Sequence, residues 1–585
     1  MDEDYVHCPP PPPHGGGPEH HEESNFREIA HAALIPVGQY AGQILLWNYD
    51  VESSQTTKSF LVNPLVANCG PALTELPQTL ASNLFCSGHT FLPDGSLVAV
   101  GGFPAGSSSH NAAFRFNPRA LNGVGSTPPP TPWQPWPSTG SVMTLPRYYP
   151  TALLLNRRSL LSPTGWHLDG ASVMVLGGPK AIVGDLGNAL WEFQENALTN
   201  WRQVYWPTTA DQSYDIVAPA NYGDDARFDS YPRALQLSNG DIFVAGDVDT
   251  AAGIPSTGHG KSWWIQTPTP ALPWRLNRGP VMATDRHYGT AVLLHQLNHK
   301  DRLLVLGGSA ASTVPPVGAL TPSASVQELR PTVNPQEPYG WSARAPLTQE
   351  RVWLNGVVLP TGDVLITGGA SAQGQPVYVP ELYRIGADPT LPVDPTNSST
   401  LMATPTTVAG CPGHFGPTPR LYHHVAVLLP NGKVFIAGGE SRYPEPSSHF
   451  TAELFEPPYL HQGHRPVIDD APAQVSFSAE NDQRTFAVGA TLPIGDTLDR
   501  VVLLRPASVT HHFDVDQRYI ELDFTVDSYS EPFPQPNPPI AGYSLTVTAP
   551  DEMLAPPGWY MLFVVSSKGG TGHRVPSVGE FVRFQ

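Results

Sequence analysis

The sequence predicts an all-β chain, with a large body of repeated strand pairs and a smaller β module at its C-terminal end. The 585 residues include 66 prolines and 53 glycines, which break or weaken helices. Apolar residues make up 40% of the chain and recur in short runs typical of strands, which excludes disorder throughout. Glycine does not recur at every third position, so a collagen-like chain is also excluded.

The first 26 residues lack strand patterning. They combine a five-proline run and a glycine triplet with His7, Cys8, His14, His20 and His21. This composition predicts a disordered tail over 1–26 that is rich in Pro, Gly and His. The imidazole and thiol groups leave a metal-gathering role open.

Residues 27–463 contain seven copies of one pattern. Each copy has an apolar strand, a turn that usually holds glycine, a second apolar strand and, in most copies, a glycine pair. Turns such as Asp-Gly and Asn-Gly between apolar runs are typical of β-hairpins. The copies lie at 31–47, 89–102, YPTALLL with 171–178, 231–247, YGTAVLL with 301–308, 353–369 and 422–439.

A further short strand follows several glycine pairs, as in AAFRFNP and AELFEP, so each copy offers about four strands. The pairs lie roughly 60–75 residues apart, beyond the kelch period of about 50, because proline-rich loops are inserted. We therefore predict a seven-bladed kelch-type β-propeller over 27–463. Such a ring protects the strand edges, and an open array of sandwiches is the structural alternative.

The repeat ends near residue 463, and strand-like runs continue to the end of the chain. Segments such as RVVLLRPASV and WYMLFVVSS alternate with turn residues over 464–585. This pattern predicts an immunoglobulin-like β-sandwich, although the Cys-Trp-Cys core of true immunoglobulin domains is missing.

Charge and hydropathy exclude several classes of partner. The 32 basic and 51 acidic residues give a net charge of −19, which argues against nucleic acid and anionic membranes. No run of 18 apolar residues is present, so we expect no membrane span. The four cysteines are too few for a disulfide framework, although a bridge between Cys69 and Cys411 is left open.

Unusual polar residues stand where predicted inner strands begin. Cys86 precedes that strand in the second copy, Tyr149 in the third, and Tyr422 with His423 in the seventh. Inner strands of a propeller start near its axis, so we expect these side chains to meet there, and His511 of the C-terminal module can add an imidazole. Imidazole and phenolate donors suit Cu(II). Singly, each residue can equally be an ordinary buried tyrosine or cysteine.

Several sequence neighbourhoods, taken in order, resemble the copper radical oxidases, the family of galactose oxidase and glyoxal oxidase. The matching segments are FCSG at 85–88, RYYPT at 147–151, RLYH at 420–423, and RPASVTHHFDVDQR at 505–518. The likeness runs from about residue 30 to the end of the chain. The form of the RYYPT segment is closer to the glyoxal oxidase-like members.

The resemblance implies one copper ion, with Tyr149, His423 and His511 as equatorial ligands and Tyr422 as the axial ligand. Cys86 matches the cysteine whose sulfur is joined to the ring of the equatorial tyrosine, so a Cys86–Tyr149 thioether is implied as a built-in redox cofactor. The implied reaction oxidises a small aldehyde or primary alcohol and reduces O2 to H2O2. Tyr422 would take the substrate's hydroxyl proton, and the Tyr149 radical would take hydrogen from carbon.

At three of the implied ligand positions, an adjacent residue of the same type could be the ligand instead. Tyr148, His424 and His512 adjoin the implied ligands, and only the family's motif positions select Tyr149, His423 and His511.

The chain also departs from the family pattern. Galactose oxidase has a tryptophan over the modified tyrosine, after the glycine pair of that blade, whereas here Gly177-Gly178 is followed by Pro179-Lys180. Trp191 and Trp353 are alternative candidates for that ring. This departure points away from galactose and toward small aldehydes or simple primary alcohols.

Two other functions remain open. The chain can be a non-catalytic kelch propeller that binds a glycan or a protein, or a copper protein without oxidase turnover. The pairing of Cys86 in one copy with Tyr149 in the next favours the oxidase, because a binding propeller has no need of it. We expect a monomer whose partners are a small-molecule substrate and O2. No signal peptide is visible, although the family implies an extracellular or cell-envelope location for a mature form.

Overall fold

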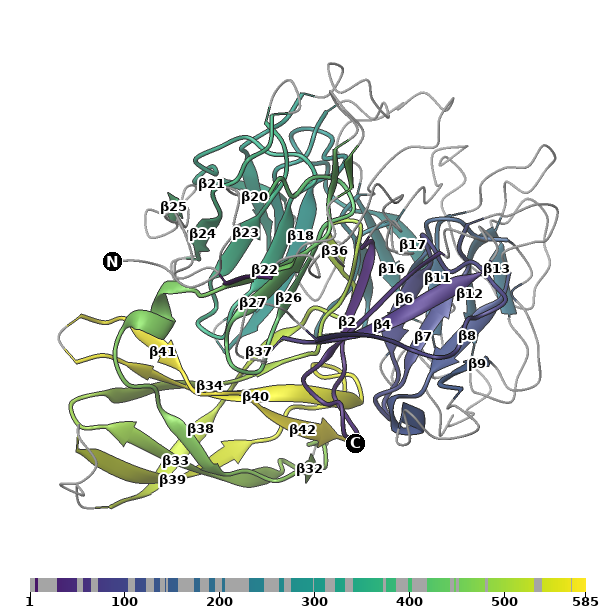
Figure 1. Cartoon of the computed structure of the whole chain (residues 1–585). Helices are drawn as coiled ribbons and strands as arrows, with labels where there is room; N and C mark the ends of the chain where they lie inside the picture. Colours follow the sequence, from purple (N-terminus) through teal and green to yellow (C-terminus); the bar gives the residue numbers. More distant parts are fainter. Residues whose placement is uncertain are drawn as a thin grey trace, which may run out of the picture.

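The structure of the protein, a computed structural model, confirms the all-β prediction (Figure 1). In the described ranges the helical elements are two short 3-10 turns, η1 Pro118–Leu121 and η6 Pro458–His461. No helix in these ranges is long and apolar enough to cross a membrane. The described residues are 6–8, 29–49, 56–64, 72–103, 111–121, 131–136, 143, 146–155, 173–178, 189–194, 202–205, 231–246, 262–267, 275–297, 299–310, 321–331, 340–371, 375–385, 398–401, 418–441, 447–448, 452–478, 482–530, 539–569 and 571–585.

The described strands before residue 463 form seven antiparallel units of four strands each. The first unit contains β2 His31–Leu34, β3 Ile44–Tyr49, β4 Thr57–Asn63 and β5 Ala72–Glu75. The second contains β6 Gly88–Phe91, β7 Leu97–Val100, β8 Ala113–Phe116 and β9 Trp133–Pro135. The third contains β10 Thr151–Leu154, β11 Val173–Leu176, β12 Ala189–Gln194 and β13 Arg202–Tyr205. The fourth contains β14 Ala234–Gln236, β15 Ile242–Val244, β16 Trp263–Gln266 and β17 Arg275–Arg278.

The remaining three units follow the same order. The fifth contains β18 Thr290–Gln296, β19 His299–Leu306, β20 Val326–Leu329 and β21 Ser342–Arg344. The sixth contains β22 Asn355–Val358, β23 Val364–Thr367, β24 Glu381–Arg384 and β25 Ser398–Leu401. The seventh contains β26 Val425–Leu428, β27 Val434–Ala437, β30 Ala452–Phe455 and β1 Val6–Cys8. A separate pair joins β28 Glu440–Ser441 to β29 Ser447–Ser448.

At several junctions between units, the first strand of one unit packs against the first strand of the next. Such contacts join β6 to β10, β10 to β14, β18 to β22 and β22 to β26. β26 of the seventh unit likewise packs against β2 of the first. These inner strands are buried, apart from the half-buried Gln296 at the end of β18, because both of their faces are covered.

The outer strand of the seventh unit comes from the N-terminal stretch. Val6 pairs with Leu454 and Cys8 with Ala452, antiparallel to β30. Three residues of the predicted disordered tail therefore form a strand. Residues 1–5 and 9–28, together with Cys69 and Cys411, lie outside the described residues.

The C-terminal module consists of two sheets with a shared apolar core. One sheet has the order β31 Val467–Asp470, β33 Thr485–Pro493, β39 Ile540–Thr548 and β38 Phe524–Tyr529. The other has the order β37 Tyr519–Leu522, β34 Thr497–Leu504, β40 Gly558–Ser567, β42 Glu580–Phe584 and β32 Gln474–Val475, with β41 Arg574–Pro576 beside β40. Val488 and Leu545 of the first sheet pack with Leu503 and Leu562 of the second. The immunoglobulin-like class of this module stays a prediction.

A hairpin of the C-terminal module reaches into the repeated body. β35 Ser508–Thr510 pairs antiparallel with β2, and β36 Phe513–Asp514 pairs with β35. β35 also packs against β6 and β26, the inner strands of the second and seventh units. Figure 1 shows the module below the repeated units, with β36 lying among them. This hairpin carries His511 at its tip.

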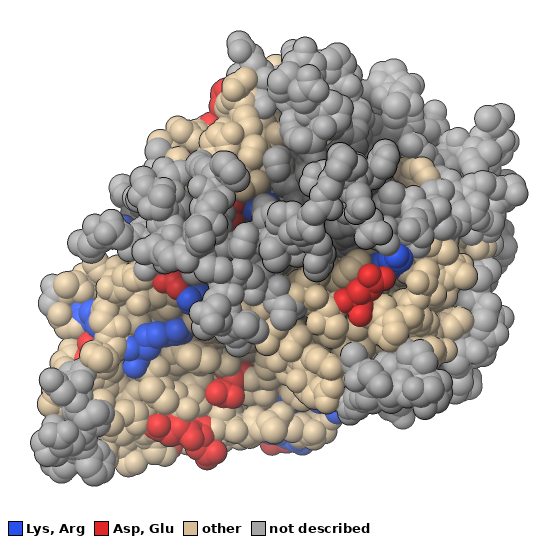
Figure 2. All heavy atoms as spheres, in the orientation of Figure 1, with Lys and Arg blue, Asp and Glu red and all other residues tan. Residues whose placement is uncertain are grey.

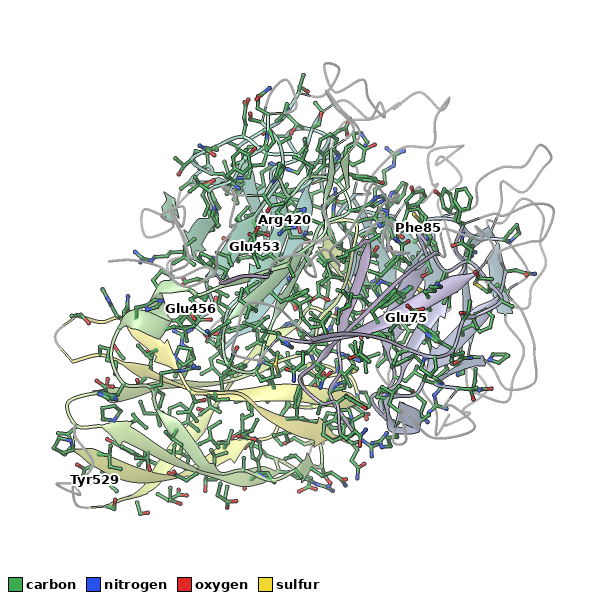
Figure 3. The ribbon with its side chains drawn as sticks, in the orientation of Figure 1. Glu75, Phe85, Arg420, Glu453, Glu456 and Tyr529 are labelled. Atoms are coloured by element: carbon green, nitrogen blue, oxygen red, sulfur yellow. The ribbon has the colours of Figure 1, made fainter. Side chains whose placement is uncertain are left out.

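Buried arginines just before inner strands donate hydrogen bonds to the glycine pairs. In four units the guanidinium donates to the carbonyl of a left-handed glycine, whose conformation turns that oxygen toward it. The pairs are Arg147 with Gly177 (2.6 Å), Arg286 with Gly307 (2.9 Å), Arg351 with Gly368 (3.1 Å) and Arg420 with Gly438 (2.7 Å). Arg420 also forms an ion pair with Glu453 at 2.8 Å, and the two lie together in Figure 3. The repeat therefore fixes the backbone just before each of these strands.

Charged side chains gather in small groups on the described surface. On the face drawn in Figure 2 the described Lys, Arg, Asp and Glu residues are separated by uncharged ones. No broad basic patch covers the described part of that face.

A buried carboxylate in the fifth unit is held by three arginines. Glu328 forms ion pairs with Arg302 (2.9 Å), Arg344 (2.7 Å) and Arg330. Burial alone would raise the pKa of Glu328. The hydrogen bonds and positive charges of these guanidinium groups outweigh that effect and lower the pKa to about 2.

The substitution Glu328→Gln should destabilise the protein by about 3 kcal/mol at neutral pH, because it leaves buried guanidinium groups without their counter-charge. A carboxylate whose pKa is lowered on folding stabilises above its unfolded pKa and loses this effect as the pH falls through its folded pKa. The difference between variant and wild type should therefore shrink as the pH falls from 4.5 toward 2. Thermal denaturation at several pH values measures it, with the exposed Glu580→Gln as control. A difference that does not change with pH would contradict this assignment.

Candidate metal centre

The residues just before the inner strands adopt a backbone conformation that is rare for residues other than glycine. Six consecutive units from the second onward have a left-handed residue two or three positions before the first strand. These residues are Cys86 (φ 60°), Tyr149 (63°), Tyr231 (44°), Tyr288 (58°), Trp353 (59°) and His423 (65°). Each such conformation costs about 1–3 kcal/mol, so the surrounding structure must impose it.

Backbone hydrogen bonds join these left-handed residues from one unit to the next. The Tyr149 N–H donates to the Cys86 carbonyl at 3.1 Å, and the Tyr231 N–H donates to the Tyr149 carbonyl at 2.7 Å. Further along, the Trp353 N–H donates to the Tyr288 carbonyl at 2.8 Å. The chain of bonds orients successive units in the same way, and it explains why side chains from distant segments converge.

His511 enters this cluster from the C-terminal module. It is fully buried, has a left-handed backbone (φ 46°), and lies beside rings from five other positions, of which His31 is the farthest at 6.1 Å between centroids. Its ring stacks on Tyr231 at 4.4 Å between centroids, and lies edge-on to Tyr149 at 5.0 Å and to Tyr422 at 5.4 Å. The ring of His423 lies 4.6 Å away. The hairpin therefore completes a site whose other members come from the repeated units.

Three donor atoms lie close enough together to share one metal ion. Cys86 Sγ, a ring nitrogen of His423 and a ring nitrogen of His511 all lie within 4.8 Å of one another. The two Nε2 atoms are 2.9 Å apart, and Cys86 Sγ is 3.6 Å from His511 Nε2. Nitrogen donors that face each other at this distance, beside phenol oxygens, form a set that suits Cu(II).

A neighbouring hydroxyl fixes the tautomer of His511. The Thr510 hydroxyl donates to the Ala30 carbonyl at 2.9 Å, because a carbonyl oxygen can only accept. It must then accept from His511 Nδ1–H, at 2.7 Å. The proton on Nδ1 leaves the Nε2 lone pair to accept from His423 Nε2–H at 2.9 Å, at the point where a metal could replace that proton. Burial, and then the nearby His423 and His31, lower the pKa of His511 and favour this neutral form.

The thiol and the phenol of the predicted crosslink lie together. The Cys86 side chain packs with those of Tyr148 and Tyr149, and the Tyr148 hydroxyl donates to the Tyr149 oxygen at 3.2 Å. Burial raises the pKa of Cys86, and burial followed by the charges of Cys86 and Tyr422 raises the pKa of Tyr149. A bound cation would act in the opposite direction and favour the thiolate and the phenolate.

The five predicted site residues form one cluster, with the imidazoles buried and the tyrosines partly exposed. Cys86, His423 and His511 are buried, whereas Tyr149 and Tyr422 keep partial exposure. Phe85 packs edge-on against His423 at 5.3 Å. Among the five, only the two tyrosines can therefore meet a substrate from solvent.

The adjoining histidines form a separate pair. The rings of His424 and His512 lie 5.6 Å apart, and His424 Nδ1 bonds to the Leu421 carbonyl at 2.8 Å. Neither belongs to the group of donor atoms around Cys86 in the described structure. The geometry thus favours His423 and His511 over their neighbours.

The ring beside Tyr149 was not foreseen from the sequence. Trp353 packs against Tyr288 and Tyr422, each at 6.2 Å, rather than against Tyr149, and the side chain of Trp191 lies outside the described residues. The rings next to Tyr149 include Tyr148 at 4.1 Å and Tyr231 at 5.1 Å. The available signal was the place of Tyr231 before the inner strand of the fourth copy.

The segment after His511 is tied to inner strands of three units. Asp516 accepts from the Thr90 hydroxyl at 2.9 Å and from the Phe91 N–H at 2.8 Å. Gln517 donates to the Gly356 carbonyl at 3.1 Å, and Arg518 donates to the Gln236 carbonyl at 2.7 Å. These bonds hold the β35–β36 hairpin in place.

Comparison with known proteins agrees with this geometry. The family model "Galactose oxidase-like, Early set domain" matches residues 465–584. The chain is 34% identical over 251 residues to "Aldehyde oxidase GLOX" of Vitis pseudoreticulata, covering 40% of this chain and 41% of the relative. It is 28% identical over 319 residues to "Galactose oxidase" of Gibberella zeae, covering 52% of this chain and 39% of the relative.

Along part of its length the chain is therefore similar to the galactose oxidase and glyoxal oxidase-like proteins. The matched segments span about two fifths of the length of these two curated relatives. The chain also shares its fold with a solved structure described as a "Novel fungal alcohol oxidase with catalytic diversity among the AA5 family, in complex with copper". That likeness has a TM-score of 0.64 at 20% identity and covers 96% of this chain and 97% of that chain.

The substitution Thr510→Val should weaken Cu(II) binding about ten- to a hundredfold, because it removes the acceptor that holds His511 in the tautomer with a free Nε2. Competition titration with a chelator of known affinity measures the change. Thr510→Ser keeps the hydroxyl and should bind nearly as wild type does, and the exposed Thr525→Val serves as control. Equal affinity of Thr510→Val and wild type would contradict the tautomer assignment.

Proposed function

We propose that the protein is a mononuclear copper radical oxidase that oxidises a small aldehyde or primary alcohol and reduces O2 to H2O2. One observation carries this proposal. A cysteine, two tyrosines and two histidines from separate parts of the chain meet at one buried point, with three of their donor atoms within 4.8 Å of one another. A scaffold that only binds a glycan or a protein has no need for such a cluster, and no described feature favours that alternative.

Tyr149, Tyr422, His423 and His511 are the residues that would hold one copper ion. The support is the donor set, since the imidazole nitrogens face each other and both phenols adjoin them. Bound copper would supply a one-electron acceptor and a place for O2 to react. Two-electron oxidation of an alcohol then needs a second one-electron acceptor, which the protein itself must provide.

Tyr149 is the proposed second acceptor. Oxidation of a primary alcohol to an aldehyde releases two electrons and two protons, and these convert one O2 to one H2O2. The hydrate of an aldehyde reacts in the same way to give a carboxylic acid. Tyr422 takes the proton of the substrate hydroxyl, and the Tyr149 oxygen takes a hydrogen atom from the carbon. The partial exposure of both rings supports these roles.

A thioether between Cys86 Sγ and the ring of Tyr149 is the proposed built-in cofactor. Its formation removes the thiol hydrogen and one ring hydrogen, and the two electrons and two protons pass to O2, which leaves as H2O2. The packing of the two side chains in one apolar cluster supports this bond. The linked ring would hold the unpaired electron over a larger group of atoms.

The proposed architecture is a closed seven-bladed kelch-type propeller followed by an immunoglobulin-like sandwich. Support comes from the contacts between inner strands, including the one between β26 and β2, and from the two-sheet core of the C-terminal module.

Two observations support a small aldehyde or primary alcohol as the substrate class. No tryptophan stacks on Tyr149 among the described residues, and the relative named as an aldehyde oxidase has the higher identity of the two compared.

Aerobic addition of Cu(II) to the purified protein should link the peptides that contain Cys86 and Tyr149, with loss of two hydrogen atoms. The loaded protein should then release H2O2 from small aldehydes or primary alcohols. Peptide mass spectrometry and a coupled peroxidase assay measure the two results. Cys86→Ser should keep the fold and copper binding but lose the link and at least about a hundredfold in kcat, since it removes the stabilised radical.

Two outcomes would contradict this function. One is an unlinked wild-type protein that yields no peroxide with any aldehyde or alcohol in the panel. The other is full activity in Cys86→Ser, which would remove the modified tyrosine from the reaction.

A further inference from the structure

A buried imidazole holds the backbone of Cys86. The Cys86 N–H donates to His31 Nε2 at 2.9 Å. Because Nε2 accepts this bond, the proton of the neutral His31 ring must lie on Nδ1. That proton faces His89 Nε2 at 3.2 Å, so His89 carries its own proton on Nδ1 and donates it to the Ser508 hydroxyl. The bonds therefore run in one direction, from Cys86 through His31 and His89 to Ser508.

Packing locks both rings of this chain. His31 and His89 are fully buried, and the indole of Trp47 stacks on His31 at 5.0 Å with an interplanar angle of 11°. The same indole lies edge-on to His89 at 4.6 Å. Burial lowers the pKa of His31 well below its usual value, and that of His89 to about 3. Both rings are thus neutral at physiological pH, as the direction of the bonds requires.

The chain of hydrogen bonds joins the strands that carry the two halves of the site. His31 lies on β2, and His89 lies on β6, the strand that begins two residues after Cys86. Ser508 lies on β35, the strand that precedes His511. In the pairing of β2 with β35, His31 stands opposite Thr510. The position of Cys86 is therefore coupled to the position of the hairpin that carries His511.

We propose that His31 is a positioning residue that holds the left-handed backbone of Cys86 so that its thiol faces the Tyr149 ring, through the chain His31–His89–Ser508. This inference rests on the proposed function, because its effect is on the Cys86–Tyr149 link. A backbone N–H cannot pass on a proton at neutral pH, so the chain positions Cys86 and does not carry protons.

The hydrogen bond from the Cys86 N–H to His31 offsets two contributions that make this conformation unfavourable. The φ of 60° at Cys86 is strained, and its N–H is buried away from water. The bond to His31 satisfies that N–H in this conformation. Rotation to an extended backbone would turn the N–H away from the imidazole and the thiol away from Tyr149. Crosslinking needs the sulfur and the ring in contact, so the bond should raise the fraction of molecules ready to react.

Substitutions at His31 can separate the effect of its hydrogen-bond acceptor from the effect of its ring packing. His31→Phe keeps a flat ring against Trp47 but has no acceptor. In His31→Gln the carboxamide reaches the place of Nε2, whereas in His31→Asn it reaches only the place of Nδ1 and cannot meet the Cys86 N–H. His287→Phe is the control, because it replaces another buried histidine at the start of an inner strand.

The test measures the rate of the Cys86–Tyr149 link in the full-length, metal-free protein after aerobic addition of Cu(II). Peptide mass spectrometry at timed intervals gives the rate, and chelator competition gives copper affinity. We expect at least a tenfold slower link in His31→Phe and His31→Asn, and a rate within about threefold of wild type in His31→Gln and His287→Phe. Copper affinity should fall by a smaller factor than the rate of the link in every variant, since His31 bonds to the Cys86 N–H and to no proposed ligand.

The outcomes separate this inference from the proposed function. A wild-type protein that binds copper and forms the link, together with His31→Phe and His31→Asn variants that link as fast, would overturn the role of His31 alone. A wild-type protein that forms no link would overturn the proposed function and this inference with it. If His31→Phe does not fold, the contrast between His31→Asn and His31→Gln decides, because both keep a carboxamide and only one reaches Cys86.

Discussion

The left-handed backbone before the inner strands is the constraint on which the candidate site depends. A cysteine, a histidine, a tryptophan and three tyrosines adopt it against their intrinsic preference, and three backbone hydrogen bonds between successive units hold five of the six in place. The arginines that clip the glycine pairs hold the same stretch of backbone from the other side. The strain is distributed over many units, so a repeated and rigid body can hold side chains from distant parts of the sequence within a few ångströms of each other.

The C-terminal module is part of the site and not an appendage. Its β35–β36 hairpin inserts His511 between the inner strands, and Asp516, Gln517 and Arg518 tie the following segment to three units. Thr510 then sets which nitrogen of His511 is free to bind. The two proposed halves of the copper site, the tyrosines and His423 on one side and His511 on the other, thus depend on each other for their geometry.

Much of this arrangement was predictable from the sequence, and the limits have physical causes. Glycine-marked hairpins predicted the all-β class and the start of each inner strand, which pointed to the segments around Cys86, Tyr149 and Tyr422. Only the motif selected Tyr149, His423 and His511 over their neighbours. Tyr231 occupies an equivalent position but lacks a motif, and His31 acts through a bond to a residue 55 positions away. Such long-range partners depend on how the units close up in space, which periodicity does not specify. The strand at Val6–Cys8 was missed for the same reason.

The central claim is that these residues form one mononuclear copper site, and anomalous diffraction from crystals of the copper-loaded protein tests it most directly. Data collected on either side of the copper absorption edge locate the metal without any assumption about activity. The account predicts a single strong peak enclosed by Tyr149, Tyr422, His423 and His511. A peak elsewhere, for example between His424 and His512, or no ordered copper in the cluster, would contradict it.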